Sequence, residues 1–301
     1  MKKKTLQNIS FIVIFLAGLS LLLYPLVSDK WNTYRQSKLM ASYEQALEEK
    51  KEEVDYTAEW QRAIAYNESL YPMILPDSFA VAEAQEEPDA MYMNALNLLG
   101  DGMMGIVEIP KIDIKLPIFH TTEEKVLQTA AGHLEGSNLP TGGEGYHAVI
   151  SAHRGLPSAA LFTDLDRMQE GDHFLIHVLD ETLCYQVDQI RVVEPFQTEA
   201  LAVEEGKDLM TLMTCTPYGV NSHRLLVRGH RVAYEPEVEE VLVEEAKAAK
   251  QISVHTDYLL WVVVGMAVTA AFIFGFILLE KKVLQKKKVE ENAFRKQDVE
   301  G

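Results

Sequence analysis

A cysteine, an arginine and a histidine stand at the ends of segments that read as β-strands. Leu209–Thr214 alternates strand-compatible side chains and ends at Cys215. A loop with a proline and a glycine follows, and a second strand-like run begins at Arg224. The two side chains can therefore face one pocket. His153 ends a further predicted strand, Ala148–Ala152. Together these residue types indicate nucleophilic catalysis by a thiol.

The expected chemistry is acyl transfer. Only the thiolate form of cysteine attacks carbonyl carbons well, so an enzyme must place polar or cationic groups beside Cys215. Of the nine histidines, His153 is the best candidate to protonate a departing amine and to deprotonate an incoming one. Arg224 carries a permanent charge and would donate hydrogen bonds to a developing oxyanion. Thr214, next to the thiol, would support these residues with a hydroxyl contact.

Two other classes of protein fit parts of this pattern. A papain-like protease also uses cysteine and histidine, but its cysteine precedes its histidine, and papain-type sequence around the cysteine is absent here. A membrane-tethered surface module with an incidental cysteine needs no catalysis. Cys184 lies in the alternating run Thr182–Val187 and is interpreted as a small buried residue rather than as a disulfide partner of Cys215. Since no His, Cys and Asp residues have the spacing of metal ligands, we expect neither metal nor cofactor.

Many short strands with few helices between them predict a mainly β protein, an antiparallel barrel or sandwich. The predicted strands are Ile106–Ile109, Leu116–Phe119, Ala148–Ala152, His173–Leu179, Leu183–Val193, Leu209–Thr214 and Arg224–Tyr234. The second of these contains Pro117 and is expected at an edge, because proline cannot donate to a ladder. Short helices are expected over Glu123–Ala130 and Ser158–Met168.

Two long uncharged runs predict membrane-spanning helices. Asn8–Ser28 follows three lysines, and Tyr258–Leu279 precedes the basic stretch 281–288. The first run could instead be a signal peptide, but no clear cleavage site follows it. Because positive residues stay in the cytoplasm, we expect both termini inside the cell membrane and the middle of the chain outside.

The chain has 301 residues and a formal net charge of −17 at pH 7. Such a charge repels nucleic-acid phosphates, so nucleic acid is not an expected partner. The predicted segments are a basic end with the first span (1–28), amphipathic helices (29–70), a proline-punctuated loop (71–102), the β-domain (103–235), an acidic stalk (236–257), the second span (258–279) and a basic cytoplasmic tail (280–301).

The segment Thr211–Cys215, with Arg224 nine residues on, resembles the Thr-Leu-x-Thr-Cys…Arg signature of sortases, the surface transpeptidases of Gram-positive bacteria. Cys215–Gly219, His223–Gly229 and Ser151–Ala159 are similar to segments of class C sortases, which polymerise pilins, and the resemblance covers about Tyr66–Val232. It implies an eight-stranded β-barrel. It also implies cleavage of a Leu-Pro-x-Thr-Gly-like signal between Thr and Gly through a thioester, and transfer to a pilin lysine. A housekeeping-type sortase that anchors surface proteins to the cell wall is the alternative.

The resemblance also implies a lid after Tyr66–Asn67. In class C sortases its anchor is an Asp-Pro-aromatic triplet, in which the aspartate pairs with the catalytic arginine and the ring covers the cysteine. The segment from Asp77 to Phe79 resembles that triplet, with Ser78 in place of proline, and this replacement predicts a less rigid anchor. Pro88–Asp89 is a weaker competitor because no aromatic residue follows it directly.

Overall fold

The structure is a computed structural model that describes residues 2–50, 56–70, 75–80 and 88–251, with isolated pieces at 263–267, 269–270, 275, 282 and 285. The chain divides into two compact units, Met1–Ile252 and Ser253–Gly301, and the fold described here is that of the first. The predicted second span (258–279) and the tail (280–301) lie almost entirely outside the described residues and stay predictions.

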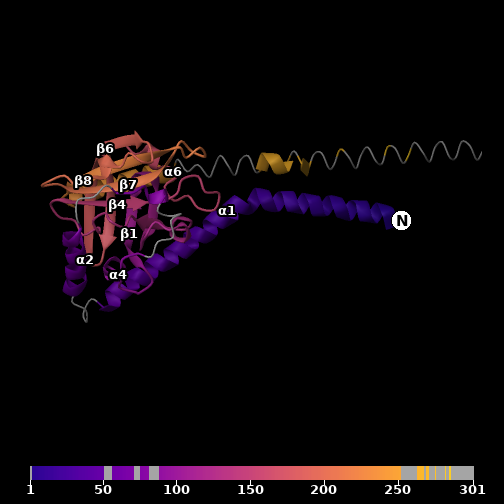
Figure 1. Cartoon of the computed structure of the whole chain (residues 1–301). Helices are drawn as coiled ribbons and strands as arrows, with labels where there is room; N and C mark the ends of the chain where they lie inside the picture. Colours follow the sequence, from indigo (N-terminus) through magenta and orange to yellow (C-terminus); the bar gives the residue numbers. More distant parts are fainter. Residues whose placement is uncertain are drawn as a thin grey trace, which may run out of the picture. The chain divides into compact units, whose positions relative to one another are not determined.

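Eight strands close into one barrel in the order β1-β2-β3-β4-β7-β8-β6-β5. Figure 1 shows the barrel, with β1, β4, β6, β7 and β8 labelled. The strands are β1 (Met103–Ile109), β2 (Ile114–His120), β3 (Ala131–His133), β4 (Tyr146–Ser151), β5 (His173–Val178), β6 (Glu181–Val193), β7 (Asp208–Thr216) and β8 (His223–Val232). The predicted mainly β architecture is confirmed, in its barrel form. Two neighbouring pairs, β2–β3 and β4–β7, are parallel, so the barrel is less uniformly antiparallel than expected.

Side chains alternate across the wall made by β4, β7 and β8. One set lies in the main hydrophobic core and the other in a smaller cluster on the opposite face. The first set is Ala148, Ile150, Ala152, Met210, Leu212, Leu225 and Val227, and the second is Val149, Met213 and Leu226. His153, Cys215 and Arg224 follow the second set by alternation. The three side chains expected to do chemistry therefore share the face opposite the main core.

Two local predictions differ from the structure. Pro117 lies within β2 of a closed barrel rather than on an edge strand, and β2 pairs with β3 only from Ile118 onward, so the proline faces a ladder partner on one side alone. The helix expected over Ser158–Met168 is wrong. Leu161 takes a left-handed φ of 43°, which interrupts a helix, and only the 3-10 turn η2 (Leu165–Arg167) forms.

Helices cover the barrel at several points. They are α1 (Lys2–Lys50), α2 (Thr57–Ser69), α4 (Ala90–Asn94), α5 (Glu124–Leu127) and α6 (Pro236–Gln251), with 3-10 turns η1 (Pro110–Ile112) and η3 (Glu199–Leu201). The apolar run and the first amphipathic helix are one continuous helix, α1. Val13–Glu49 contains an 18-residue window of mean hydropathy 1.6, none of it buried, so α1 is long and apolar enough to cross a membrane.

The helices are fixed to the barrel by specific contacts. Tyr43 of α1 is almost fully buried; its hydroxyl donates to the Met104 carbonyl at 3.2 Å and accepts from the Leu179 amide at 3.0 Å. The described part of the predicted acidic stalk is helix α6, whose Leu242 packs against Cys184 in the barrel wall. This first part of the stalk is therefore docked on the barrel.

Asn67 connects α2 to the loop before β4. Its amide oxygen accepts from the Leu139 amide at 2.7 Å, and its amide nitrogen donates to the Thr141 hydroxyl at 3.0 Å. Asn67→Ala leaves the buried Leu139 N–H without this acceptor, so we expect a loss of about 1–3 kcal/mol in unfolding free energy, seen as a lower thermal midpoint in detergent. The exposed Asn94, bonded only within its own helix to the Ala90 carbonyl, is the control. Its alanine variant should change stability by about 0.5 kcal/mol or less. Equal stability of the two variants would contradict the role of Asn67.

Candidate active site

The strand order brings the three chemistry-bearing residues to one place, because β7 lies between β4 and β8. Cys215 on β7 is the direct cross-strand partner of Arg224 on β8. On its other side β7 runs parallel to β4, in register as far as Ser151 opposite Met213, and His153 and Cys215 each lie two residues further on. Residues two positions apart on a strand return to the same face. The side chains of Cys215, His153 and Arg224 therefore lie on the same face of the barrel wall, at the same end.

The Cys215 thiol is buried, with 6% of the residue exposed. Burial raises the pKa of the thiol, the nearby Arg224 charge lowers it, and the Asp77 carboxylate raises it again. The net direction is upward, which favours the protonated thiol at neutral pH. Burial is the main cause of the raised pKa of the thiol and the Asp77 carboxylate adds to it, so the arrangement disfavours the reactive thiolate.

The Arg224 guanidinium is engaged at all three nitrogens. Its Nε and Nη2 donate to the two carboxylate oxygens of Asp77, each at 2.7 Å, and both side chains are almost fully buried. Its Nη1 donates to the carbonyl oxygens of Asn221 and His223 at 3.1 and 3.2 Å. Burial alone would lower the pKa of the guanidinium, but the hydrogen bonds to Asp77 and the charges of Cys215 and Asp77 raise it above its usual value.

His153 is less buried, with 19% of its side chain exposed. Its Nε2 lies 3.3 Å from Oε2 of Glu124 on α5, a partner that the sequence reasoning missed because nothing in the sequence connects two residues of different elements 29 positions apart. The Phe79 ring also contacts the imidazole, with ring centroids 5.5 Å apart. The imidazole thus has a carboxylate and an aromatic ring as neighbours.

The backbone around His153 is fixed from β7. Thr214, predicted to contact the reacting groups, points to the core side of the wall, and its hydroxyl donates to the Ala152 carbonyl at 2.8 Å. The prediction of a direct contact is corrected by strand alternation, which turns Thr214 away from the face of Cys215. Arg154 donates from Nη1 to the Thr216 hydroxyl at 3.2 Å and pairs with Asp166. These hydrogen bonds from Thr214 and Thr216 of β7 therefore fix the residues on either side of His153.

The segment Asp77–Ala80 lies on the site. Asp77 forms the two-pronged pair with Arg224, and the guanidinium carbon of Arg224 lies 4.9 Å from the centroid of the Phe79 ring. Phe79 also packs against the smaller cluster, with Leu75. The ring was expected over Cys215; the structure places it against the arginine and the histidine that flank the thiol.

Ser78 is not a loose substitute for proline. The residue is fully buried, its hydroxyl accepts a hydrogen bond from the Ser151 hydroxyl at 2.8 Å, and its carbonyl accepts from the Thr122 hydroxyl at 2.8 Å. The loss of rigidity expected from the sequence is therefore offset by two hydrogen bonds. A proline could form only the one that the carbonyl accepts. The competing anchor, Asp89, instead caps α4 by accepting from the Met91 amide at 2.6 Å.

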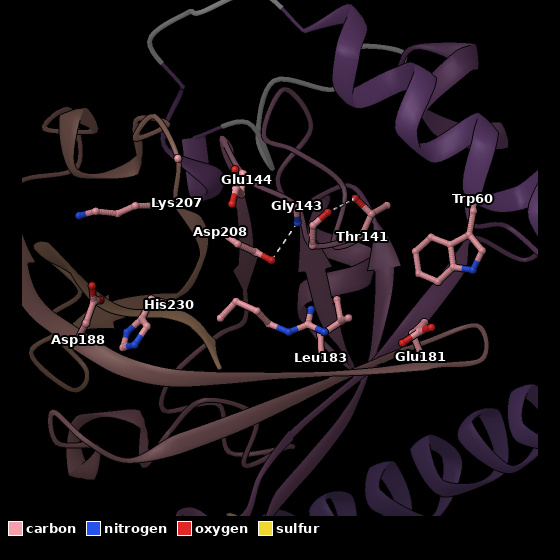
Figure 2. Close-up of a pocket in the computed structure, with 13 residues that line it drawn as sticks. Trp60, Thr141, Gly143, Glu144, Glu181, Leu183, Asp188, Lys207, Asp208 and His230 are labelled. Carbon is pink, nitrogen blue, oxygen red and sulfur yellow. Dashed lines mark hydrogen bonds between the residues drawn. The ribbon is translucent and has the colours of Figure 1, made fainter. Parts of the chain in front are cut away.

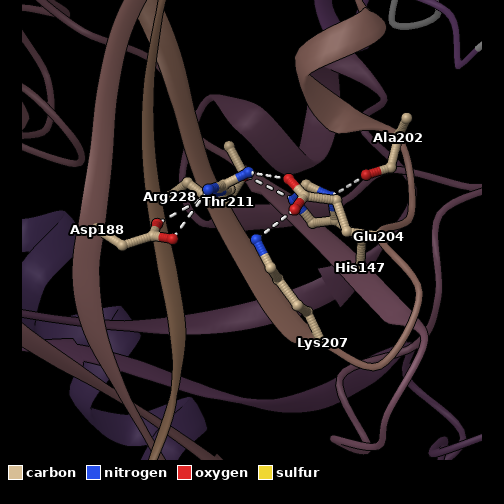
Figure 3. A network of polar contacts seen from close by, with 7 residues as sticks. All are labelled: His147, Asp188, Ala202, Glu204, Lys207, Thr211 and Arg228. Carbon is tan, nitrogen blue, oxygen red and sulfur yellow. Dashed lines mark hydrogen bonds and ion pairs between the residues drawn. The ribbon is translucent and has the colours of Figure 1, made fainter.

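A second polar network anchors the loop between β6 and β7 (Figure 3). Arg228 donates from Nε and Nη2 to Asp188 at 3.0 and 2.8 Å and also pairs with Glu204 in that loop. Beside it, His147 bonds the Ala202 carbonyl at 2.9 Å and the Thr211 hydroxyl at 2.8 Å. Burial lowers the pKa of His147, which favours the neutral ring. The loop is thereby tied to the same wall as the candidate site.

A separate groove of about 1030 Å³ lies at the other end of β7 (Figure 2). It is lined by residues of several elements, among them Trp60 of α2, Glu144 of the β3–β4 loop and Asp208 at the start of β7. Asp208 accepts from the Gly143 amide at 2.9 Å and from the Tyr185 hydroxyl at 2.9 Å. The predicted catalytic residues are not among those that line it.

The two cysteines are both free thiols, so the alternative of a disulfide between them is wrong. Cys184 lies on β6 beneath α6, where burial raises the pKa of its thiol to about 11. Within the described part of the chain, no three His, Cys, Asp or Glu side chains are grouped as a metal site. Cys215 is therefore the thiol with reactive neighbours.

Comparison with known proteins agrees with this geometry. The family profile described as the sortase domain matches residues 107–232. Sortase A of Bacillus anthracis is 27% identical over 154 residues, which cover 51% of this chain and 71% of that protein. Among solved structures, sortase C of Streptococcus pneumoniae is 43% identical with a TM-score of 0.58, covering 65% of this chain and 97% of the other. Sortase C1 of Streptococcus agalactiae is 44% identical with a TM-score of 0.57, covering 66% and 100%.

A closed β-barrel with a buried thiol, an imidazole and a guanidinium at neighbouring strand ends defines a cysteine acyltransferase scaffold. The chain belongs to the sortase family. With sortase C structures as its neighbours, it is a class C cysteine transpeptidase.

The electrostatics of the site lead to a prediction about Asp77. Asn in place of Asp77 keeps the shape and removes a negative charge that raises the Cys215 pKa, while Arg224 still lowers it. We therefore expect the pH profile of Cys215 alkylation to move to lower pH and the rate at pH 7 to rise, about tenfold per unit of pKa. Asp188→Asn, which alters the equivalent ion pair with Arg228, is the matched control and should leave the pH profile of Cys215 alkylation unchanged. An unchanged profile for Asp77→Asn would contradict the assigned cause.

Proposed function

We propose that this sortase joins pilin subunits: it cleaves a Leu-Pro-x-Thr-Gly-like sorting signal between Thr and Gly and transfers the acyl group to a pilin lysine. The observation that carries the proposal is the lid segment Asp77–Ala80 seated on Arg224, beside His153 and Cys215. The structural neighbours add support, since one is described as a pilus-related sortase C of group B Streptococcus, 41% identical with a TM-score of 0.57.

The roles of the three residues follow from the bonds that must form and break. The Cys215 thiolate attacks the carbonyl carbon of the Thr–Gly bond, and Arg224 donates hydrogen bonds to the oxyanion that develops. The C–N bond then breaks, His153 protonates the departing glycine amine, and a thioester remains on Cys215. A lysine amine attacks the thioester and loses a proton to His153. The products are an isopeptide bond and the free thiolate.

The lid sets when this chemistry can start. Nε and Nη2 of Arg224, the donors suited to a substrate carbonyl, are occupied by Asp77. The same carboxylate raises the pKa of the thiol. A closed lid therefore occupies the oxyanion donors and adds to the effect of burial in keeping the nucleophile protonated, and the enzyme acts when the segment from Asp77 to Phe79 moves out.

The catalytic barrel works outside the cell, held at the membrane. The apolar part of α1 supplies the N-terminal anchor, and the predicted run 258–279 would return the chain through the bilayer. Lysines precede the first run and follow the second, and they favour a cytoplasmic location for both termini. The partners are then a lipid bilayer and exported proteins with C-terminal sorting signals.

The direct test combines the purified chain with pilins from the same bacterium and looks for high-mass ladders that survive boiling in detergent. Ladders with a lysine-bearing pilin and none with its Lys→Arg variant would support polymerisation. Transfer only to a cell-wall peptide acceptor would indicate the housekeeping type of sortase instead. Hydrolysis without any transfer would reject both.

The triad predicts a graded loss of activity. Cys215→Ala should abolish the thioester and the ladders, and His153→Ala should be nearly as severe, by about 10²–10⁴-fold. Arg224→Lys should also be poor, because lysine keeps the charge but loses the planar fork of donors. Cys184→Ala is the control and should retain ladder formation. Mass spectrometry of the acyl-enzyme and gel analysis measure the two steps, and full activity in Cys215→Ala or His153→Ala refutes the mechanism.

Phe79→Ala should weaken the lid without touching the reacting atoms. The ring contact with Arg224 contributes about 0.5–2 kcal/mol, so its loss should speed both Cys215 alkylation and hydrolysis of a sorting-signal peptide by several-fold. Ladder formation should persist. Phe196→Ala, which removes a largely exposed ring elsewhere, serves as the control. If alkylation rates are the same in the Phe79→Ala chain and the unchanged chain, Phe79 does not hold the lid closed.

A further inference from the structure

The turn of α1 that follows the uncharged N-terminal run contacts the loop that carries the candidate catalytic histidine. This histidine loop comprises residues 152–164. Asp29 of α1 accepts from the Ala160 amide through Oδ1 at 3.0 Å, and Asn32 donates from Nδ2 to the Ser158 carbonyl at 2.7 Å. Asp29 is also the first charged residue after the uncharged run. The histidine loop is therefore bonded to the helix at the level where its apolar part ends.

One turn further along, α1 reaches a second support of the same histidine. Gln36 is buried on α1, with 7% exposed, and donates from Nε2 to the Thr129 carbonyl at 2.7 Å. Thr129 is the second residue beyond α5, the helix whose Glu124 lies 3.3 Å from His153. A single face of α1 thus braces both the loop of the histidine and the segment of its carboxylate neighbour.

The opposite face of the same turns is exposed and carries aromatic and basic side chains. Trp31 and Tyr34 are 61% and 50% exposed, with ring centroids 6.1 Å apart, and Lys38 lies 5.1 Å above the Tyr34 ring. Lys30 and Arg35 are exposed beside them. Tryptophan and tyrosine gather at membrane–water interfaces, and basic residues next to a span are attracted to anionic headgroups.

We infer that this turn of α1 seats the histidine loop against the lipid headgroups, so that the candidate active site lies at the bilayer surface. With a rise of 1.5 Å per residue, Asn32 stands only about 6 Å beyond Ser28, the last residue of the uncharged run. The headgroup region is about 5–8 Å deep on each side of the bilayer. The candidate site then lies where peptide segments emerge from the membrane. The inference rests on the membrane anchorage proposed above.

The charge distribution favours this turn of α1 as the part of the chain that contacts the lipid headgroups. The whole chain carries −17, so an anionic lipid surface repels most of it, while the cluster of Lys30, Arg35 and Lys38 is attracted. The acidic residue of the turn, Asp29, accepts a hydrogen bond from the Ala160 amide through Oδ1 and lies on the face turned to the histidine loop. The barrel is therefore oriented as well as anchored.

The test measures the depth of labelled sites in the full chain, reconstituted in vesicles of phosphatidylcholine and phosphatidylglycerol. In a Cys215→Ala background, Pro157→Cys and Ala160→Cys place a fluorophore on the histidine loop at exposed positions. Glu144→Cys, exposed in the loop at the opposite end of β4, is the matched control. Lipids with a nitroxide on the headgroup should quench both loop labels strongly and the Glu144 label little, and nitroxides deep in the acyl chains should quench all three weakly.

Tryptophan fluorescence gives an independent measurement that needs no label. A chain whose only tryptophan is Trp31 should be quenched by headgroup nitroxides, and one with only Trp60, beside the distal groove, should not. Equal quenching at both ends of β4, or strongest quenching from the acyl-chain nitroxide at the loop, overturns the inference in a chain that floats with the vesicles. A chain that does not float removes the anchorage as well, which separates failure of the proposed localisation from failure of this inference alone.

Discussion

The pair between Asp77 and Arg224 is the interaction on which the site depends. Both side chains are nearly buried and form two parallel charge-assisted hydrogen bonds of 2.7 Å. Removing one partner from such a pair typically costs about 3–5 kcal/mol, because the other charge is left buried and unpaired. The carboxylate can therefore depart only as another acceptor or water reaches the guanidinium. A substrate carbonyl beside Cys215 is such an acceptor, since Arg224 lies directly across the strand pair from the thiol.

The face that carries this pair has a second fork of the same kind. Arg224 and Arg228 lie four residues apart on β8 and so point to the same side of the wall. Arg228 pairs with Asp188, at the bulge of β6, and with Glu204 in the β6–β7 loop. Arg224 instead pairs with Asp77, which lies between α2 and α4 in the sequence. Leu201 of the β6–β7 loop packs in the same small cluster as Leu75 and Phe79. Arg228 therefore holds the barrel wall and the β6–β7 loop, Arg224 holds the segment proposed above as a lid, and the loop and that segment meet in a shared apolar cluster.

Much of this was predictable from the sequence, and the omissions have physical causes. Strand alternation and the loop residues located the strands that present Cys215 and Arg224, and the resemblance pointed to Asp77. The three-residue β3 is too short to show a period, and the parallel pairing of β4 with β7 depends on distant segments rather than on local pattern. The partner of Ser78 was also out of reach: only the folded chain brings its hydroxyl to Ser151, 73 residues away.

The three candidate catalytic side chains are held by interactions of different strength. Cys215 and Arg224 sit in a continuous ladder between β7 and β8, where backbone pairing fixes both side chains. His153 lies beyond the end of β4, in a loop held by two hydrogen bonds to α1 and by one each to Thr214 and Thr216. Its contact with Glu124 joins a carboxylate that is 56% exposed, and such an ion pair contributes at most about 1 kcal/mol. The proposed nucleophile and the proposed oxyanion donor are therefore preorganised, while His153, proposed to give a proton to one amine and take it from another, is held by weaker contacts.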